Sequence, residues 1–504
     1  MTLAFDSSMD FLWALLPEAV LAAWAMAVLL AGVWGEEEAQ LSHGYVQAFA
    51  WFSVAGIAMA ALLNGWLQGV SVTADAGMIT VDGFRLFANW IFLLGAALVV
   101  LFSVPYVRRR RLQPGEFYAL ILLATVGMMV LAATMNLILL FLALETMAIA
   151  SYALTAFNRR DRRSAEAGLK YFVLGAFSSG FLLYGIALVW GATGSVELSE
   201  IAGAVQGGAG FGGLLGAGMA LLGVGFAFKV AAVPFHMWAP DVYEGAPTPA
   251  TALMAASVKA ASVVALMRVF LVAFPGLYES WFPIAWWLAA LTMIGANLLA
   301  LAQSNVKRML AYSSVAHGGY LLVGLAAGNE VATAGVLFYL FVYTIMTVGA
   351  FAILMIVSEQ GEERLQLDDF AGYGATRPAV ALLLTIFLLS LAGFPGTGGF
   401  VAKIYLLQGA VASQLWTLAV ILALTTVVSY FYYLRVAWTM WMRPAPESTV
   451  PRPEAGIPGS VRAALLVSAA VILFLGILPG GLLEGALTAA DGLGVFDGVL
   501  GQVP

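Results

Sequence analysis

Cysteine is absent from the 504 residues, and histidine occurs only three times. Without thiols, the chain can form no disulfide, iron–sulfur cluster or thiolate metal site. Three histidines also argue against a haem or a metal cage built from imidazoles. The sequence therefore predicts a protein that has no redox centre and no cofactor of its own.

Charged residues are scarce as well, at 10% of the chain, and the net charge is -6. No basic arm or tail could follow a phosphate backbone, which argues against nucleic-acid binding. Apolar residues make up 62% of the chain, in runs of about 20 residues that could cross ~30 Å of hydrocarbon. The first run, from about Phe11 to Trp34, lacks the basic n-region of a cleavable signal peptide, so we interpret it as a span. The composition predicts an all-α polytopic membrane protein.

The apolar runs predict fourteen spans. They start near Phe11, Tyr45, Leu86, Phe117, Asn136, Ala167, Phe211, Pro249, Phe282, Val306, Val331, Pro378, Leu415 and Ala463. The runs around Pro234 and Pro395 contain proline and glycine, and each allows either one long span or a broken one.

Arginine-rich links set the predicted orientation, because all of them follow odd-numbered spans. They lie at 107–113, 158–163, 305–308 and in the link that holds Arg443, Arg452 and Arg462. The positive-inside rule places these links in the cytoplasm and both termini on the outer, periplasmic side.

Ionisable residues inside the predicted spans are the main candidates for function. They are Glu145, Lys170, Lys229, Lys259 and Lys403, whereas Lys307 falls in a basic link. A charge near the bilayer centre costs ~2.5–3.5 kcal/mol on insertion scales, so such residues usually face the bundle interior. Snorkelling or structural ion pairing is the alternative, most of all for Lys170, which lies about one and a half turns into its span. The number of lysines in mid-span positions favours a functional role.

Lysine suits reversible protonation, because burial can release its proton while arginine stays charged. Glu145 then sets the proton affinity of a lysine, either Lys170 or Lys229. His317 lies within a span and is either a proton relay between lysine sites or a hydrogen bonder between packed helices.

Two proline-containing interruptions suggest an internal repeat. Lys229 lies five residues before Pro234, and Lys403 lies eight residues after Pro395. Each break predicts a hydrated pocket beside its lysine, although an ordinary proline kink is the alternative. The separation is nearly constant for three pairs of residues. It is 174 residues for Lys229 and Lys403, 172 for Glu145 and His317, and 176 for Lys259 and Arg435.

Because this offset covers five spans, an odd number, the second copy would be inverted. The predicted organisation is an N-terminal three-helix unit (1–115), five-helix repeats at 116–275 and 276–442, and a cytoplasmic link with a last helix (443–504).

Four stretches resemble the antiporter-like membrane subunits of respiratory complex I, the bacterial NADH:quinone oxidoreductase. They are "GLKYFVLGAFSSGFLLYG", "KVAAVPFHMWAPDVYEGAPTPATA", "KRMLAYSSVAHGGYLLVG" and "SLAGFPGTGGFVAKIYLL". The resemblance covers essentially the whole chain and implies fourteen helices with inverted five-helix repeats and a half-channel in each. By position it assigns proton-translocating roles to Glu145, Lys170, Lys229, Lys259 and Lys403. Arg435 has no position that the resemblance assigns.

Within this family, the lysine at 403 argues against the M type, which has glutamate there, and the short end after helix 14 argues against the L type. The N type and the D type of multisubunit sodium/proton antiporters remain, and the segment around Lys170 favours the N type. The implied function is non-redox proton translocation in the bacterial cytoplasmic (inner) membrane, driven by quinone reduction elsewhere.

The implied partners are other membrane subunits of complex I and the lipid bilayer, with NADH, FMN, iron–sulfur clusters and quinone held by partner subunits. A stand-alone cation/proton exchanger and a purely structural scaffold are the alternatives from other functional classes.

Overall fold

The computed structural model describes residues 2–5, 7–33, 42–72, 77–208, 212–357, 365–444 and 458–496. Its elements are β1 (Thr2–Leu3), α1 (Ser8–Ala14), α2 (Leu16–Val33), α3 (His43–Leu67), β2 (Ser71–Val72), α4 (Gly83–Arg109), α5 (Pro114–Ala133), α6 (Leu137–Thr155), α7 (Arg162–Thr193), α8 (Leu198–Gln206), α9 (Gly213–Val230), α10 (Trp238–Gly245), α11 (Thr248–Leu253), η2 (Met254–Val258), α12 (Lys259–Arg268), η3 (Val269–Ala273), η4 (Pro275–Leu277), α13 (Tyr278–Leu301), α14 (Val306–Ala327), α15 (Glu330–Val357), η5 (Leu367–Phe370), α16 (Tyr373–Thr376), α17 (Pro378–Ala392), α18 (Gly398–Ala412), α19 (Trp416–Met442), α20 (Gly459–Ile477) and α21 (Gly480–Asp491). The two short strands pair in parallel.

Thirteen of the described helical segments are long and apolar enough to cross a membrane. The predicted eighth span is continuous from α11 to η3, with π-helical turns on either side of α12. At the predicted twelfth span stand two shorter apolar helices, α17 and α18. The first candidate span begins at Leu16, because the predicted start near Phe11 falls in the separate helix α1. The predicted all-α polytopic architecture is confirmed.

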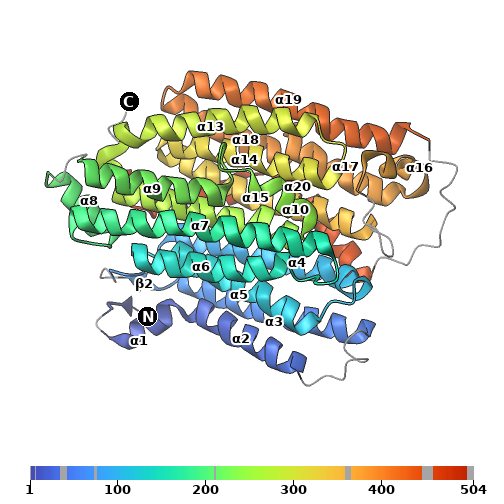
Figure 1. Ribbon diagram of the computed structural model, residues 1–504, viewed down its shortest axis with the longest axis horizontal. Coiled ribbons are helices and arrows are strands. Elements are labelled where there is room, and N and C mark those ends of the chain that lie inside the picture. Colours follow the sequence, from blue (N-terminus) through green and yellow to red (C-terminus); the bar gives the residue numbers. More distant parts are fainter. Residues whose placement is uncertain are drawn as a thin grey trace.

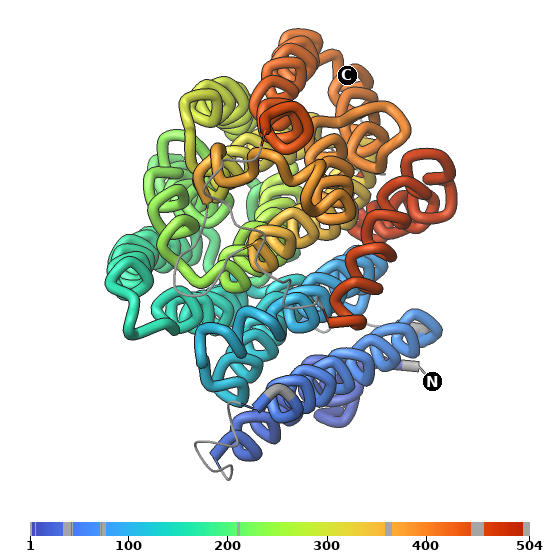
Figure 2. The backbone as a smooth tube through the Cα atoms, turned by 90° about the vertical axis from the view of Figure 1, so that its right-hand side faces the viewer, coloured from blue at the N-terminus to red at the C-terminus, as the bar shows by residue number. Residues whose placement is uncertain are grey.

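The long helices run side by side along one common direction (Figure 1). The link helices α8 and α16 lie at opposite ends of this bundle (Figure 1). Figure 2 shows the N-terminal helices α2 and α3 along one edge and α13 and α19 on the far side, while the last helices, α20 and α21, return to pack against α4.

Three segments form the centre of the bundle. The spans 248–273 and α14 are 94% buried and α15 is 89% buried, whereas α2 and α20 are only 28% and 33% buried. Of these three, α14 has the lowest mean hydropathy, 1.2. A helix that carries polar residues is stable in a membrane when other helices surround it, which fits the burial of α14. The segment α15 is buried as well, although its mean hydropathy of 2.4 is the highest among the candidate spans.

Both proline-containing interruptions are non-helical. The chain leaves α9 after Val230 and becomes helical again at Trp238, and it leaves α17 after Ala392 and resumes at Gly398. Gly393 ends α17 with a φ of 85°, and a Cβ there would lie 2.9 Å from Cδ of Lys403. Glycine is needed at 393 for both reasons, because other residues rarely adopt this φ and would collide with the lysine.

Two arginines outside the basic links are buried in ion pairs. The Arg85 guanidinium is fully buried and donates to Oε1 of Glu18 at 2.8 Å. Arg268 is also buried and donates to both carboxylate oxygens of Asp82, at 2.7 and 2.9 Å. Because Asp82 also caps the N-terminus of α4, this pair fixes the end of the central span 248–273 to α4.

We expect Arg268→Ala to destabilise the protein strongly. Removing one partner of a buried ion pair leaves the other charge uncompensated, at a cost of ~3–5 kcal/mol. Thermal unfolding of the purified chain in detergent would measure the loss. The control is Arg443→Ala, which breaks an exposed pair with Asp368 worth about 0–1 kcal/mol. Equal stability losses in the two variants would contradict this prediction.

Candidate functional site

The first cation of the interior is Lys229, in the last turn of α9 just before the break. Its side chain is 5% exposed, and Nζ donates to the hydroxyl of Tyr152 at 3.3 Å. Tyr152 lies two turns after Glu145 on α6, so both residues are on the same face of this helix. Glu145 accepts a hydrogen bond from Ser179 of α7 and lies near enough to Lys229 to interact with its charge.

Lys170 does not belong to this buried group, and the expectation that it is buried is wrong for this chain. Its side chain is 43% exposed, and Nζ pairs with Glu166 at 2.8 Å and with Asp241 at 3.1 Å. Position 170 faces outward because α7 turns its other side to the bundle. Of the two partners left open for Glu145, the geometry favours Lys229.

Lys259 occupies the centre of the bundle, directly after the π-helical turn η2. It is 2% exposed and donates to the backbone carbonyl of Ser314 on α14. The hydroxyl of Tyr343 on α15 donates to Oγ of the same serine at 3.0 Å. Lys259 is therefore connected to both of the other central helices.

His317 lies on α14 with a tyrosine hydroxyl at each ring nitrogen. Nδ1 lies 2.5 Å from Oη of Tyr339 on α15, and Nε2 lies 3.1 Å from Oη of Tyr433 on α19. Tyr433 also bonds to the hydroxyl of Ser313. Since a neutral imidazole has one donor and one acceptor, and each phenol can be either, the ring can hold both bonds in either tautomer.

The third buried cation, Lys403, lies just beyond the second helix break. Its Nζ donates to the carbonyls of Leu391 at 3.2 Å and Ala392 at 2.9 Å, at the C-terminal end of α17. These carbonyls lose their helical partners at the break, and a cation interacts favourably with a helix C-terminus. Lys403 therefore stabilises the broken end that its own span creates.

Arg435 of α19 has a different role from the lysines. Its guanidinium donates to the carbonyls of Leu301 and Gln303 at the C-terminal end of α13. These bonds join two outer helices and make Arg435 a helix cap.

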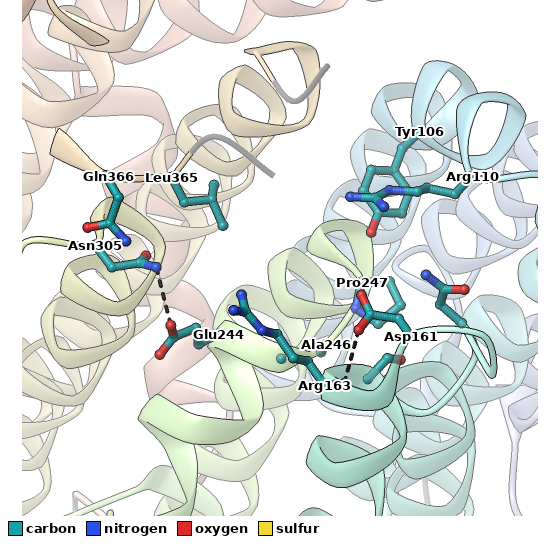
Figure 3. A pocket seen from close by; sticks show the side chains of 13 residues that line it. Tyr106, Arg110, Asp161, Arg163, Glu244, Ala246, Pro247, Asn305, Leu365 and Gln366 are labelled. Carbon is teal, nitrogen blue, oxygen red and sulfur yellow. Dashed lines mark hydrogen bonds between the residues drawn. The ribbon is translucent and has the colours of Figure 1, made fainter. Parts of the chain in front are cut away.

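A polar cavity of about 480 Å³ lies where several of the arginine-rich links meet (Figure 3). Tyr106 and Arg110 line one side, and Asp161, Arg163 and Glu244 another (Figure 3). Beneath it, the ammonium of Lys307 is fully buried and donates to the carbonyls of Glu244 and Ala246. Lys307, which the sequence places in a basic link, therefore also holds the C-terminal end of α10.

An ion-pair cluster lies beside this cavity and joins three helices. Asp241 of α10 binds Lys170 and Arg308, and Arg308 also binds Glu244 at 2.8 Å. Burial alone would raise the pKa of Asp241, but hydrogen bonds from Arg308 and Lys170 hold it below its usual value. This carboxylate therefore stays ionised near neutral pH.

Tyrosines are the site residues that the sequence reasoning missed. Tyr339 and Tyr343 are four residues apart, so they lie on one face of α15, and both are buried beside His317. Hydroxyl groups repeated at this spacing in an apolar span were the signal. Each of these hydroxyls can both donate and accept a hydrogen bond.

Comparison with known proteins identifies the family of this chain. Residues 134–429 match the family described as "NADH:quinone oxidoreductase/Mrp antiporter, TM". The NADH-quinone oxidoreductase subunit N of Trichlorobacter lovleyi is 47% identical over 479 residues, which cover 94% of this chain and 96% of the relative.

Comparison with solved structures supports the same family. A chain of respiratory complex I from Thermus thermophilus superposes with a TM-score of 0.78 and 35% identity, covering 94% of this chain and 100% of that one. A chain of the Mrp complex from Dietzia superposes at 0.79, covering 96% and 99%, but with 21% identity it shows only a shared fold. The chain thus belongs to the antiporter-like membrane subunits of NADH:quinone oxidoreductase, in the N-type branch whose members it resembles over almost its whole length.

Proposed function

We propose that this chain translocates protons across a bacterial cytoplasmic membrane through Glu145, Lys229, Lys259, His317 and Lys403. One observation carries the proposal. Lys229, Lys259, His317 and Lys403 are at most 5% exposed, and the three ammoniums donate to hydroxyl or carbonyl oxygens. A neutral amine keeps N–H groups for such acceptors, whereas an ion pair would hold the proton in place.

Lys170 has another role in this proposal. Its ion pairs with Glu166 and Asp241 put it in the cluster beside the cavity, where it holds α7 against α10. We therefore assign Lys170 to that cluster, and we assign proton translocation to the buried lysines Lys229, Lys259 and Lys403.

Two inverted five-helix units, 116–275 and 276–442, would supply the two halves of the path. Lys229 and Lys403 each lie beside a helix break, and Glu145 and His317 each lie on the second helix of their unit. Residues 1–115 and 443–504 would flank these units. The equivalence of positions supports a repeat, as in membrane transporters built from inverted halves.

The energy for transport has to come from partners. Moving one proton against 100 mV takes ~2.3 kcal/mol. The relatives are named as subunits of NADH-quinone oxidoreductase, so we place NADH, FMN, iron–sulfur clusters and quinone in other subunits, with neighbouring membrane subunits as direct contacts.

Replacing Lys229 tests this function. We expect Lys229→Ala to assemble, and to lower NADH oxidation and proton pumping together by at least about tenfold, as loss of a proton-transfer group does. Pumping in inverted membranes, normalised to assembled complex, is the measurement. The control is Tyr278→Phe, whose hydroxyl binds only the carbonyl of Ala326. A normal ratio of protons to electrons in assembled Lys229→Ala would refute the proposal.

Glu145 tests whether a charge tunes the first lysine. Glu145→Gln keeps an acceptor for Ser179 but removes the charge, and we expect it to lower activity several-fold with little loss of assembly. Glu145→Asp keeps the charge on a shorter side chain and should retain part of the activity. NADH oxidation and pumping in both variants decide the matter. Near-normal activity in both would show that the charge at 145 is unused.

The orientation can be tested by labelling, because the chain has no cysteine. We expect Asn158→Cys, in the cavity wall, to react with a membrane-impermeant thiol reagent in inside-out vesicles only. The matched control is Ser199→Cys on α8, at the other end of the bundle, which should react only in right-side-out vesicles. A gel shift of this subunit reports labelling. The reverse pattern would invert the orientation.

A further inference from the structure

Lys403 lies over the face of a buried aromatic ring. Its Nζ is 4.8 Å from the centroid of the Tyr320 ring. Lys403 is 4% exposed and Tyr320 is 1% exposed. A cation attracts an aromatic face most strongly when neither water nor a counter-ion intervenes. Because both residues are buried, the attraction between Lys403 and the Tyr320 ring is of this stronger kind.

The other contacts of Lys403 leave its charge without an opposite charge. An ammonium has three donors, and two of them bond the carbonyls of Leu391 and Ala392. Among the ion pairs of the described residues, none involves Lys403. Lys229, by contrast, has the carboxylate of Glu145 nearby. Lys403 therefore has the π face of Tyr320 as its electron-rich partner, whereas Lys229 has a carboxylate.

The ring of Tyr320 is held by a chain of hydrogen bonds. Asn297 Nδ2 donates to the Tyr320 hydroxyl at 3.2 Å, and the Tyr432 hydroxyl donates to Asn297 Oδ1 at 3.0 Å. Both partners are buried and belong to other helices, α13 and α19. The ring is fixed, whereas Lys403 has a flexible four-carbon stem.

Phenols and an imidazole are the titratable groups that pack against this contact, and the charge of Lys259 also acts on that imidazole. His317 of α14 packs edge-on against Tyr320 at 5.5 Å and is bonded to Tyr339 of α15. Tyr430 of α19 donates to the carbonyl of Gly393 at 2.7 Å. The ring of Tyr320 is thus the electron-rich surface that faces the ammonium.

We propose that Tyr320 sets the proton affinity of Lys403, stabilising the ammonium over the neutral amine while the side chain lies on its ring. When Lys403 moves off the ring, one N–H bond breaks, the proton passes to a water or hydroxyl oxygen, and a neutral amine remains. The carbonyl bonds survive this step, because the amine still has N–H donors. Tyr320 acts as a positioning residue, and the inference rests on the proposed function of Lys403.

Fluorination tests the contact without changing the shape of the ring. In assembled complex, Tyr320→Phe would be compared with mono-, di- and trifluorinated phenylalanine at position 320, since each fluorine weakens the negative potential of the face. We expect the alkaline side of the pH–activity profile to move stepwise to lower pH, by about one pH unit over the series. Proton pumping in inverted membranes across pH is the readout. A profile that does not change with fluorination would overturn the role of Tyr320.

Two further variants separate this inference from the proposed function. Lys403→Ala should abolish pumping, and if it pumps normally the proposed function itself fails. If Lys403→Ala is inactive while the fluorinated series is flat, only the role of Tyr320 is lost. Tyr278→Leu removes a buried ring of equal size from α13 and should leave the pH profile unchanged. A shift in Tyr278→Leu as large as the shift across the fluorinated series would mean general packing damage and would contradict the inference.

Discussion

The exclusion of charge from hydrocarbon is the constraint on which this structure depends. An unpaired charge in a span is costly, so every buried cation in the interior has oxygen acceptors or a π face around it. Arg85 and Arg268 have carboxylates, whereas Lys229, Lys259 and Lys403 have hydroxyls and carbonyls. The first kind of partner holds a permanent charge, whereas the proposed function requires the second kind, beside which a lysine can lose its proton.

Helix breaks supply much of this polar environment. In an intact helix the carbonyls already accept hydrogen bonds from the N–H groups of the same helix. A span in lipid therefore offers few acceptors to a buried ammonium. The end of α17 frees the carbonyls of Leu391 and Ala392 for Lys403. At the first break the freed carbonyl of Phe228 instead accepts from the indole N–H of Trp238 at 3.0 Å, and Lys229 bonds a tyrosine. The two breaks differ in position as well as in chemistry, because Lys229 precedes the first break and Lys403 follows the second.

Tyrosines recur around the buried lysines Lys229, Lys259 and Lys403. Lys229 bonds Tyr152, the serine that accepts from Lys259 also bonds Tyr343, and the histidine between the second and third lysines is held by two further phenols. A phenol is polar enough to accept a proton-bearing donor and aromatic enough to pack among Leu and Phe side chains. This dual character places polar groups among the most buried helices without adding fixed charge.

The sequence by itself determined the helical membrane architecture, the positions of the two interruptions and the burial of Lys229, Lys259 and Lys403. Hydropathy, proline and scarce charge are local signals, and a lipid environment leaves few alternatives to helices. Only the tertiary structure decided that Lys170 faces outward, that Lys307, Arg85 and Arg268 are buried, and that tyrosines surround His317. Those outcomes depend on which face of each helix meets a neighbour. Nearly uniform apolar spans do not encode that face, because most of their residues suit lipid and protein equally well.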